Sequence, residues 1–116
     1  MRESAIQKQI QLALGSRPDI RVFRNNVGFI KLGDRAIRYG LMPGSGDLIG
    51  WHTRTITAAD VGTQVAVFLS VEVKNAAGRE RPEQRLWRQA IQAAGGIAFT
   101  ARSAEEALAA VERRIP

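Results

Sequence analysis

Two segments near opposite ends of the chain place apolar residues three and four positions apart, which is the pattern of an amphipathic helix. The first segment runs from Ser4 to Leu14, and the other follows Ser103. Both begin with the spacing of a capping box, because Gln7 and Glu106 each lie three residues after a serine. We therefore expect a helix near each end. The apolar stripe of the last helix is Ala104, Ala107, Leu108, Val111 and Ile115.

A third helix is predicted between these two. Pro82 suits its first turn, where the missing N–H has no helical partner, and the pair Gly95–Gly96 ends it. Gln84 lies three residues before Trp87 and seven before Ile91, so the spacing places its amide on the packed face of the helix. Such an amide either serves a site beside the helix or bonds to backbone at the edge of the core. The spacing leaves both interpretations open.

Alternation of apolar and polar positions predicts the strands of the chain. They are Arg21–Asn25, the arms Phe29–Leu32 and Ala36–Tyr39 of a hairpin around Gly33–Arg35, Asp47–Trp51, Gln64–Lys74 and Gly96–Thr100. A polar, threonine-rich connection, Thr53–Thr63, holds a turn near Ala59 and Asp60. The order of helices and strands, without a repeat or a linker, predicts one α/β domain over residues 1–116 with a mixed β-sheet flanked by helices.

The run Val65–Val71 is hydrophobic on both alternating faces, which is typical of a central strand buried on both sides. Glu72 and Lys74 follow it, and because they lie two positions apart they project from the same face. A carboxylate and an ammonium there cost desolvation energy that a purely structural sheet would avoid. Asp47, on the glycine-rich turn Pro43–Gly50, adds a second carboxylate. The alternative is a plain turn aspartate and an ion pair at a sheet edge.

These side chains fit the hydrolysis of a phosphodiester. A divalent cation polarises the phosphoryl group and generates hydroxide near neutral pH, and carboxylates such as Asp47 and Glu72 can hold it. The main-chain carbonyl of Val73 can complete the coordination, and Lys74 can orient the water or offset developing charge. The chain has no cysteine and a single histidine, His52, so metal binding depends on oxygen ligands, which suit Mg²⁺ or Mn²⁺.

The charge of the chain indicates a polyanionic partner. Its 17 basic residues against 11 acidic ones give a net charge of +6, and arginine, whose planar fork suits phosphate oxygens, outnumbers lysine. A positive charge also keeps many proteins merely soluble, so it does not establish nucleic-acid binding by itself. The basic residues form two groups, Arg21, Arg24, Lys31, Arg35 and Arg38, and Arg79, Arg81, Arg85 and Arg88. We expect the arginines around the Pro82 helix to lie opposite Gln84, free to contact a phosphate backbone.

Four segments carry a family resemblance. They are Arg2-Glu3-Ser4, the turn Gly44–Gly50 with Asp47, Val71–Lys74 with Glu72, and Arg81–Trp87. In this order and spacing they resemble the PD-(D/E)XK nucleases, and in particular their VRR-NUC branch, over almost the whole chain, with residues 53–63 least covered. The proline that names the superfamily is Pro43 here, four residues before Asp47, and Gly46 takes the adjacent position, which is a common variation.

The resemblance implies a restriction-endonuclease-like core, with an added hairpin and a C-terminal helix, that cuts DNA with Mg²⁺ or Mn²⁺. It makes Asp47 and Glu72 metal ligands, Lys74 the catalytic lysine and Gln84 the active-site residue of a helix. Glu3 becomes a first-helix carboxylate of the metal site, although a carboxylate that only favours the helix dipole fits its position equally well. Standalone members of this branch, from phages and bacteria, look like homodimers that act on branched DNA such as Holliday junctions.

Several alternatives stay open at this point. A DNA-binding module with a nuclease-like fold and no catalysis is one, and an RNA- or nucleotide-processing enzyme is another, since metal-assisted phosphoryl chemistry is shared. The hairpin either forms a dimer interface or folds onto its own sheet. No apolar stretch approaches the ~20 residues of a membrane span, and residues 1–4 do not begin a signal peptide, so we expect a cytoplasmic protein. The apolar residues of the hairpin are Phe29, Ile30, Leu32, Ile37, Tyr39 and Leu41.

Overall fold

The structure, a computed structural model, describes residues 2–113. The chain forms two compact units, residues 1–55 and residues 56–116. That the two units make up one domain stays a prediction. In the described part of the chain, no helix is both long enough and apolar enough to cross a membrane.

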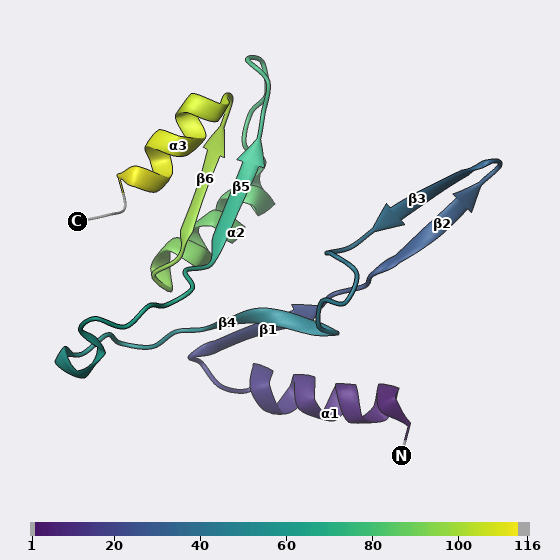
Figure 1. Cartoon of the computed structure of the whole chain (residues 1–116), viewed down its shortest axis with the longest axis horizontal. Helices are drawn as coiled ribbons and strands as arrows, with labels where there is room; N and C mark the ends of the chain where they lie inside the picture. The colour runs from purple at the N-terminus through teal and green to yellow at the C-terminus, as the bar shows by residue number, and fades with distance from the viewer. Residues whose placement is uncertain (1, 114–116) are drawn as a thin grey trace. The chain divides into compact units, whose positions relative to one another are not determined.

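The first unit consists of one helix and two antiparallel strand pairs (Figure 1). Helix α1 (Glu3–Gly15) packs against β1 (Ile20–Arg24), and β1 pairs with β4 (Leu48–His52). Strands β2 (Gly28–Leu32) and β3 (Arg35–Tyr39) pair with each other as the predicted hairpin. Among the described residues this hairpin is a two-stranded sheet of its own.

The second unit is a strand–helix–strand unit followed by a helix (Figure 1). Strands β5 (Leu69–Val73) and β6 (Ile97–Ala101) are parallel neighbours, and α2 (Pro82–Ala93) connects them. Parallel strands need such a crossover, because a tight turn cannot join them. Helices α2 and α3 (Ala104–Glu112) both pack on β6. A short 3₁₀ helix, η1 (Ala58–Asp60), occupies the turn that the sequence predicted before β5.

The core of the second unit is small. Ile91, Ala98 and Ala101 are buried, and Ile91 is the large side chain among them. Trp87 reaches β5, because its Nε1 donates a hydrogen bond to Ser70 Oγ at 2.9 Å. The packed face of α2 that was predicted from the spacing of Trp87 and Ile91 is therefore confirmed.

The α/β class is confirmed. The described residues form three two-stranded sheets, of which β1–β4 and β2–β3 are antiparallel and β5–β6 is parallel. The helices and strands follow one another in the predicted order. A single mixed sheet with a restriction-endonuclease-like core stays a prediction.

The first helix begins earlier than predicted. It starts at Glu3, and its N-cap is Arg2, which has the extended backbone of a cap residue but makes no side-chain cap bond. Ser4 therefore lies inside the helix, and the capping box predicted for Ser4 and Gln7 is wrong. Because the chain enters the helix upstream, Glu3 lies in the first turn, where the helix dipole favours a carboxylate.

The last helix is capped nearly as predicted. Ser103 Oγ accepts a hydrogen bond from the Glu106 N–H at 3.1 Å. The Glu106 carboxylate accepts from the Arg102 N–H at 2.6 Å, one residue before the position that a regular capping box uses. Ile115, which was predicted in the apolar stripe of this helix, lies outside the described residues.

The strand that carries Glu72 differs most from its prediction. It covers Leu69–Val73 instead of residues 64–74, and β6 is its one strand partner in the described residues. Helix α2 covers the face with Ser70 and Glu72, whereas on the other face Val71 is 39% exposed and Val73 is 77% exposed. Two apolar faces make a strand suitable for burial on both sides, but a second layer must also be present. Within the second unit, the prediction of a fully buried central strand is therefore wrong.

Candidate functional site

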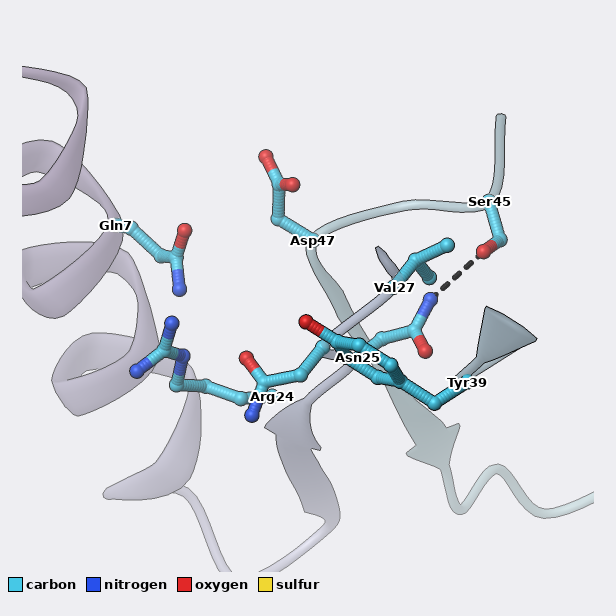
Figure 2. A pocket seen from close by; sticks show the side chains of 8 residues that line it. Gln7, Arg24, Asn25, Val27, Tyr39, Ser45 and Asp47 are labelled. Atoms are coloured by element: carbon cyan, nitrogen blue, oxygen red, sulfur yellow. Dashed lines mark hydrogen bonds between the residues drawn. The ribbon is translucent and has the colours of Figure 1, made fainter. Parts of the chain in front are cut away.

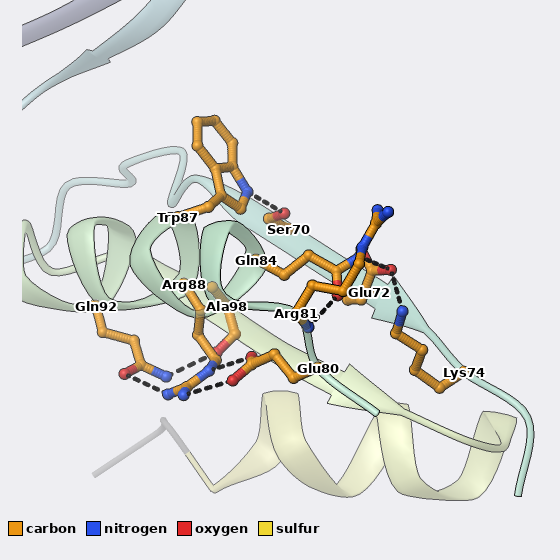
Figure 3. Close-up of polar contacts among 10 residues, drawn as sticks. All are labelled: Ser70, Glu72, Lys74, Glu80, Arg81, Gln84, Trp87, Arg88, Gln92 and Ala98. Atoms are coloured by element: carbon orange, nitrogen blue, oxygen red, sulfur yellow. Dashed lines mark hydrogen bonds and ion pairs between the residues drawn. The ribbon is translucent and has the colours of Figure 1, made fainter. Parts of the chain in front are cut away.

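Three of the predicted site residues meet where β5 ends beside the start of α2 (Figure 3). Lys74 Nζ lies 3.4 Å from Glu72 Oε1, which confirms that the two side chains share a face. Gln84 Nε2 donates a hydrogen bond to the same Glu72 oxygen at 2.7 Å. We refer to Glu72, Lys74 and Gln84 as the Glu72 cluster.

The start of α2 fixes the orientation of the Gln84 amide. The backbone N–H of Arg81, the N-cap residue, donates to Gln84 Oε1 at 2.9 Å. With its oxygen engaged in this way, the amide must present its nitrogen to Glu72. The bond to backbone that one interpretation expected is confirmed, and the amide nitrogen binds Glu72. That the amide serves a functional site stays a prediction.

In the Glu72 cluster, the lysine side chain is largely buried and the carboxylate is more exposed. The Lys74 side chain is 17% exposed and the Glu72 side chain is 41% exposed. Gly78 lies against the lysine stem, since a Cβ at this position would come 3.0 Å from Lys74 Cδ. Glu72 Oε2 makes no hydrogen bond with another described residue. One oxygen of the carboxylate is thus held in place and the other is available to a ligand.

Asn75 shapes the loop between β5 and α2 that passes over Lys74. Its Oδ1 accepts hydrogen bonds from the N–H groups of Ala77 at 3.1 Å and Gly78 at 2.9 Å. The Arg102 guanidinium donates to the Gly78 carbonyl at 2.7 Å. These contacts hold Gly78 where its missing side chain leaves room for the lysine. They were not predicted from the sequence, although an asparagine three residues before a glycine is a turn signal.

Arg88 is not free to contact a phosphate, in contrast to the sequence prediction. Its Nε and Nη2 atoms donate to the two carboxylate oxygens of Glu80 at 2.7 Å and 3.0 Å (Figure 3). The hydrogen bond from Arg88 lowers the pKa of Glu80, and the same bond raises the pKa of Arg88. Arg88 does not lie on the face opposite Gln84, as was predicted, because it follows Gln84 by four residues and therefore shares its face of the helix.

The other arginines of this group remain candidates for DNA contact. Arg79 and Arg85 are exposed, and Arg81 is exposed beside Glu83, with its Nε 3.4 Å from a Glu83 oxygen. An exposed pair of this kind adds little stability and separates easily. A phosphate contact by these three residues stays a prediction.

In the first unit, Asp47 lies directly before β4 and lines a cavity of about 390 Å³. Glu3 and Gln7 of α1 line the same cavity, together with apolar residues. The structure thus brings Glu3 and Asp47 to one cavity, as the resemblance implies. The Asp47 carboxylate makes no hydrogen bond or ion pair with another described residue.

The loop that carries Asp47 is held by Asn25, which directly follows β1. Asn25 Nδ2 donates to Ser45 Oγ at 2.7 Å and to the Gly46 carbonyl at 2.9 Å, and its Oδ1 accepts from the Leu41 N–H at 3.3 Å. Its own N–H donates to the Asp47 carbonyl at 2.9 Å. One side chain therefore fixes the glycine-rich turn. This role of Asn25 was not predicted from the sequence, because its partners are about 20 residues away.

The described residues contain no group of three or more histidine, cysteine, aspartate or glutamate side chains that could hold a metal ion. Asp47 and Glu3 belong to the first unit and Glu72 to the second. The metal site predicted from Glu3, Asp47, Glu72 and the Val73 carbonyl stays a prediction. No protein-family model matches the chain, and neither curated proteins nor solved structures give a significant match.

Proposed function

We propose that this protein is a metal-dependent endonuclease that hydrolyses phosphodiester bonds of DNA. The observation that carries the proposal is the Glu72 cluster, in which one carboxylate oxygen is held by Gln84 and Lys74 while the other is available. A carboxylate that only formed an ion pair at a sheet edge would not need an amide fixed by a helix N-cap to orient it.

The donor atoms of the proposed site suit Mg²⁺ or Mn²⁺, which prefer oxygen ligands. Asp47 has an unpaired carboxylate at a cavity shared with Glu3, and Glu72 has an available oxygen. The resemblance assigns these residues and the main-chain carbonyl of Val73 to one ion. When bound, the ion would polarise the phosphoryl group and lower the pKa of a bound water.

The residues of the chain supply positioning and charge. Gln84 holds Glu72 through one oxygen and so fixes the carboxylate plane. Lys74 places a partly buried ammonium 3.4 Å from that oxygen, where it can orient a water or offset the negative charge that develops on the phosphate. The net charge of +6 favours a polyanionic substrate, and exposed Arg79 and Arg85 can contact its backbone.

We further propose a homodimer that acts on branched DNA such as Holliday junctions. In the β2–β3 register, Ile30 lies opposite Ile37, and these two share a face with Leu32. All three side chains are between 45% and 58% exposed. A two-fold axis would bury this apolar face on both subunits and pair two active sites, as a symmetric cut across a junction requires.

An assay with defined DNA tests the proposed activity. Labelled four-way junction, flap, duplex and single-stranded DNA, with single-stranded RNA beside them, are incubated with Mg²⁺, with Mn²⁺ or with EDTA. We expect cleavage of DNA with either ion, strongest for the junction, and none with EDTA. Ca²⁺ should support binding without cleavage, because it holds its oxygen ligands at longer distances. Cleavage that persists in EDTA would contradict the proposal, and DNA binding with no cleavage under any condition would favour a non-catalytic module.

A further inference from the structure

A second cavity of the first unit contains polar groups that no interaction described so far uses. Its volume is about 380 Å³, within the range of small-ligand sites, and its lining includes Gln7, Arg24, Asn26, Tyr39 and Asp47 (Figure 2). Asp47 and Gln7 also line the cavity that contains Glu3. We refer to this second cavity as the Arg24 pocket.

Several side chains of the Arg24 pocket have donors and acceptors without a hydrogen-bond partner among the described residues. The Arg24 guanidinium, the Gln7 amide and the Tyr39 hydroxyl make no hydrogen bond with another described side chain or backbone group, and the Asp47 carboxylate makes none either. Arg24 and Asp47 carry opposite charges and line one cavity, yet they form no ion pair. A cation and an anion that do not neutralise each other can each meet the opposite charge of a ligand.

We propose that the Arg24 pocket binds a phosphodiester of the DNA strand next to the bond that is cut, with Arg24 and Tyr39 donating to its oxygens. The planar guanidinium suits phosphate oxygens, and the phenol adds a neutral donor. Asp47, which lines both cavities, would hold the cation to which the neighbouring phosphate binds. This inference rests on the proposed function.

Gly28 positions the tyrosine of the pocket. It lies directly opposite Tyr39 in the β2–β3 register, and a Cβ at Gly28 would come 2.5 Å from Tyr39 Oη. The tyrosine ring therefore lies across the glycine. Any larger residue at position 28 must displace the ring, so Gly28 acts on the pocket through Tyr39 and is a positioning residue.

The test measures DNA binding without divalent ions, so that its readout is independent of cleavage. Affinity for a single-stranded oligonucleotide is measured in EDTA over a range of salt concentrations. Arg24→Gln should weaken binding and reduce the slope of log K against log[salt] by about one, the value expected for one lost phosphate contact. Arg113→Gln, which removes the charge of an exposed arginine on the other unit, is the matched control and should keep the slope.

Two uncharged changes test the same pocket should Arg24→Gln fold poorly. Tyr39→Phe removes only the hydroxyl and should weaken binding roughly tenfold, as for a hydrogen bond to a charged group, without a change in slope. Gly28→Ala should act in the same direction. Cleavage by the parent protein together with unaltered binding by Arg24→Gln and Tyr39→Phe would overturn the inference alone. Loss of slope in Arg24→Gln with no cleavage by the parent would support the pocket while the proposed nuclease function fails.

Discussion

At the scale of single residues, some basic side chains are paired with a carboxylate and others are not paired among the described residues. Arg88 is already paired, since it donates to both oxygens of Glu80 and to the Gln92 amide, and Lys74 is held close to Glu72 in a partly buried position. Arg24 has no such partner among the described residues. Substrate binding is therefore expected to depend on Arg24 far more than on Arg88, although both are arginines.

The Glu80–Arg88 pair predicts a pH dependence of stability. The pKa of Glu80 is lowered in the folded protein by its hydrogen bond from Arg88, so the pair stabilises the fold above the unfolded pKa of about 4.3. That contribution is lost as the pH falls through the lower folded pKa. Glu80→Gln should reduce Tm at pH 7, and the gap to the parent should narrow below about pH 4.3.

The matched control for this prediction is Glu112→Gln, an exposed glutamate with no ion pair to another described residue. It should follow the parent from pH 7 to pH 3. A Tm gap for Glu80→Gln that stays constant over this range would show that the ionised carboxylate does not stabilise the fold.

At the scale of elements, the bounds of most helices and strands could be predicted from the sequence, but the burial of a strand could not. The hairpin, α2 and the strand β6 lie within a residue or two of their predicted bounds, because local spacing and the glycines and prolines at their ends specify them. The covering of β5 depends on which layers pack against it, and no local pattern carries that information. The full-length buried strand was wrong for this reason.

In the candidate site too, local geometry could be predicted and contacts between distant segments could not. The shared face of Glu72 and Lys74 follows from strand geometry, and the position of Gln84 follows from helical spacing, so both could be predicted. The contacts of Asn25 and Glu80 join segments 8 to 21 residues apart through side chains. Such pairings depend on how the chain turns between the partners, which one sequence does not reveal.

Helix α2 and the loop before it give a prediction for DNA affinity. Arg79→Gln combined with Arg85→Gln should reduce the salt slope of DNA binding by about two, one per phosphate contact. Arg88→Gln should lower Tm and leave the slope close to that of the parent, because Arg88 is already paired. A fall in slope for Arg88→Gln as large as that for each exposed arginine would contradict this assignment.

At the scale of the whole molecule, the proposed homodimer predicts a mass of two chains. The molar mass is measured at micromolar concentration by analytical ultracentrifugation. Ile30→Glu, on the apolar face of the β2–β3 hairpin, should give a monomer, because it buries an unpaired charge at the interface. Ala36→Glu, on the opposite face of the same hairpin, is the control and should remain dimeric. A parent protein with the mass of one chain would rule out this assembly.

The central claim is that the Glu72 cluster is the active centre of a metal-dependent nuclease, and Lys74→Ala tests it most directly. The rate of cleavage of a labelled four-way junction in Mg²⁺ is measured for the parent, Lys74→Ala and the exposed-lysine control Lys8→Ala, with DNA affinity measured beside it. Lys74→Ala should lose about 10²-fold or more in cleavage rate, because the lysine acts in the transition state. It should keep nearly all of its DNA affinity, because it removes only one of many positive charges. Lys8→Ala should cut like the parent. A Lys74→Ala protein that cuts at the parental rate would contradict the account.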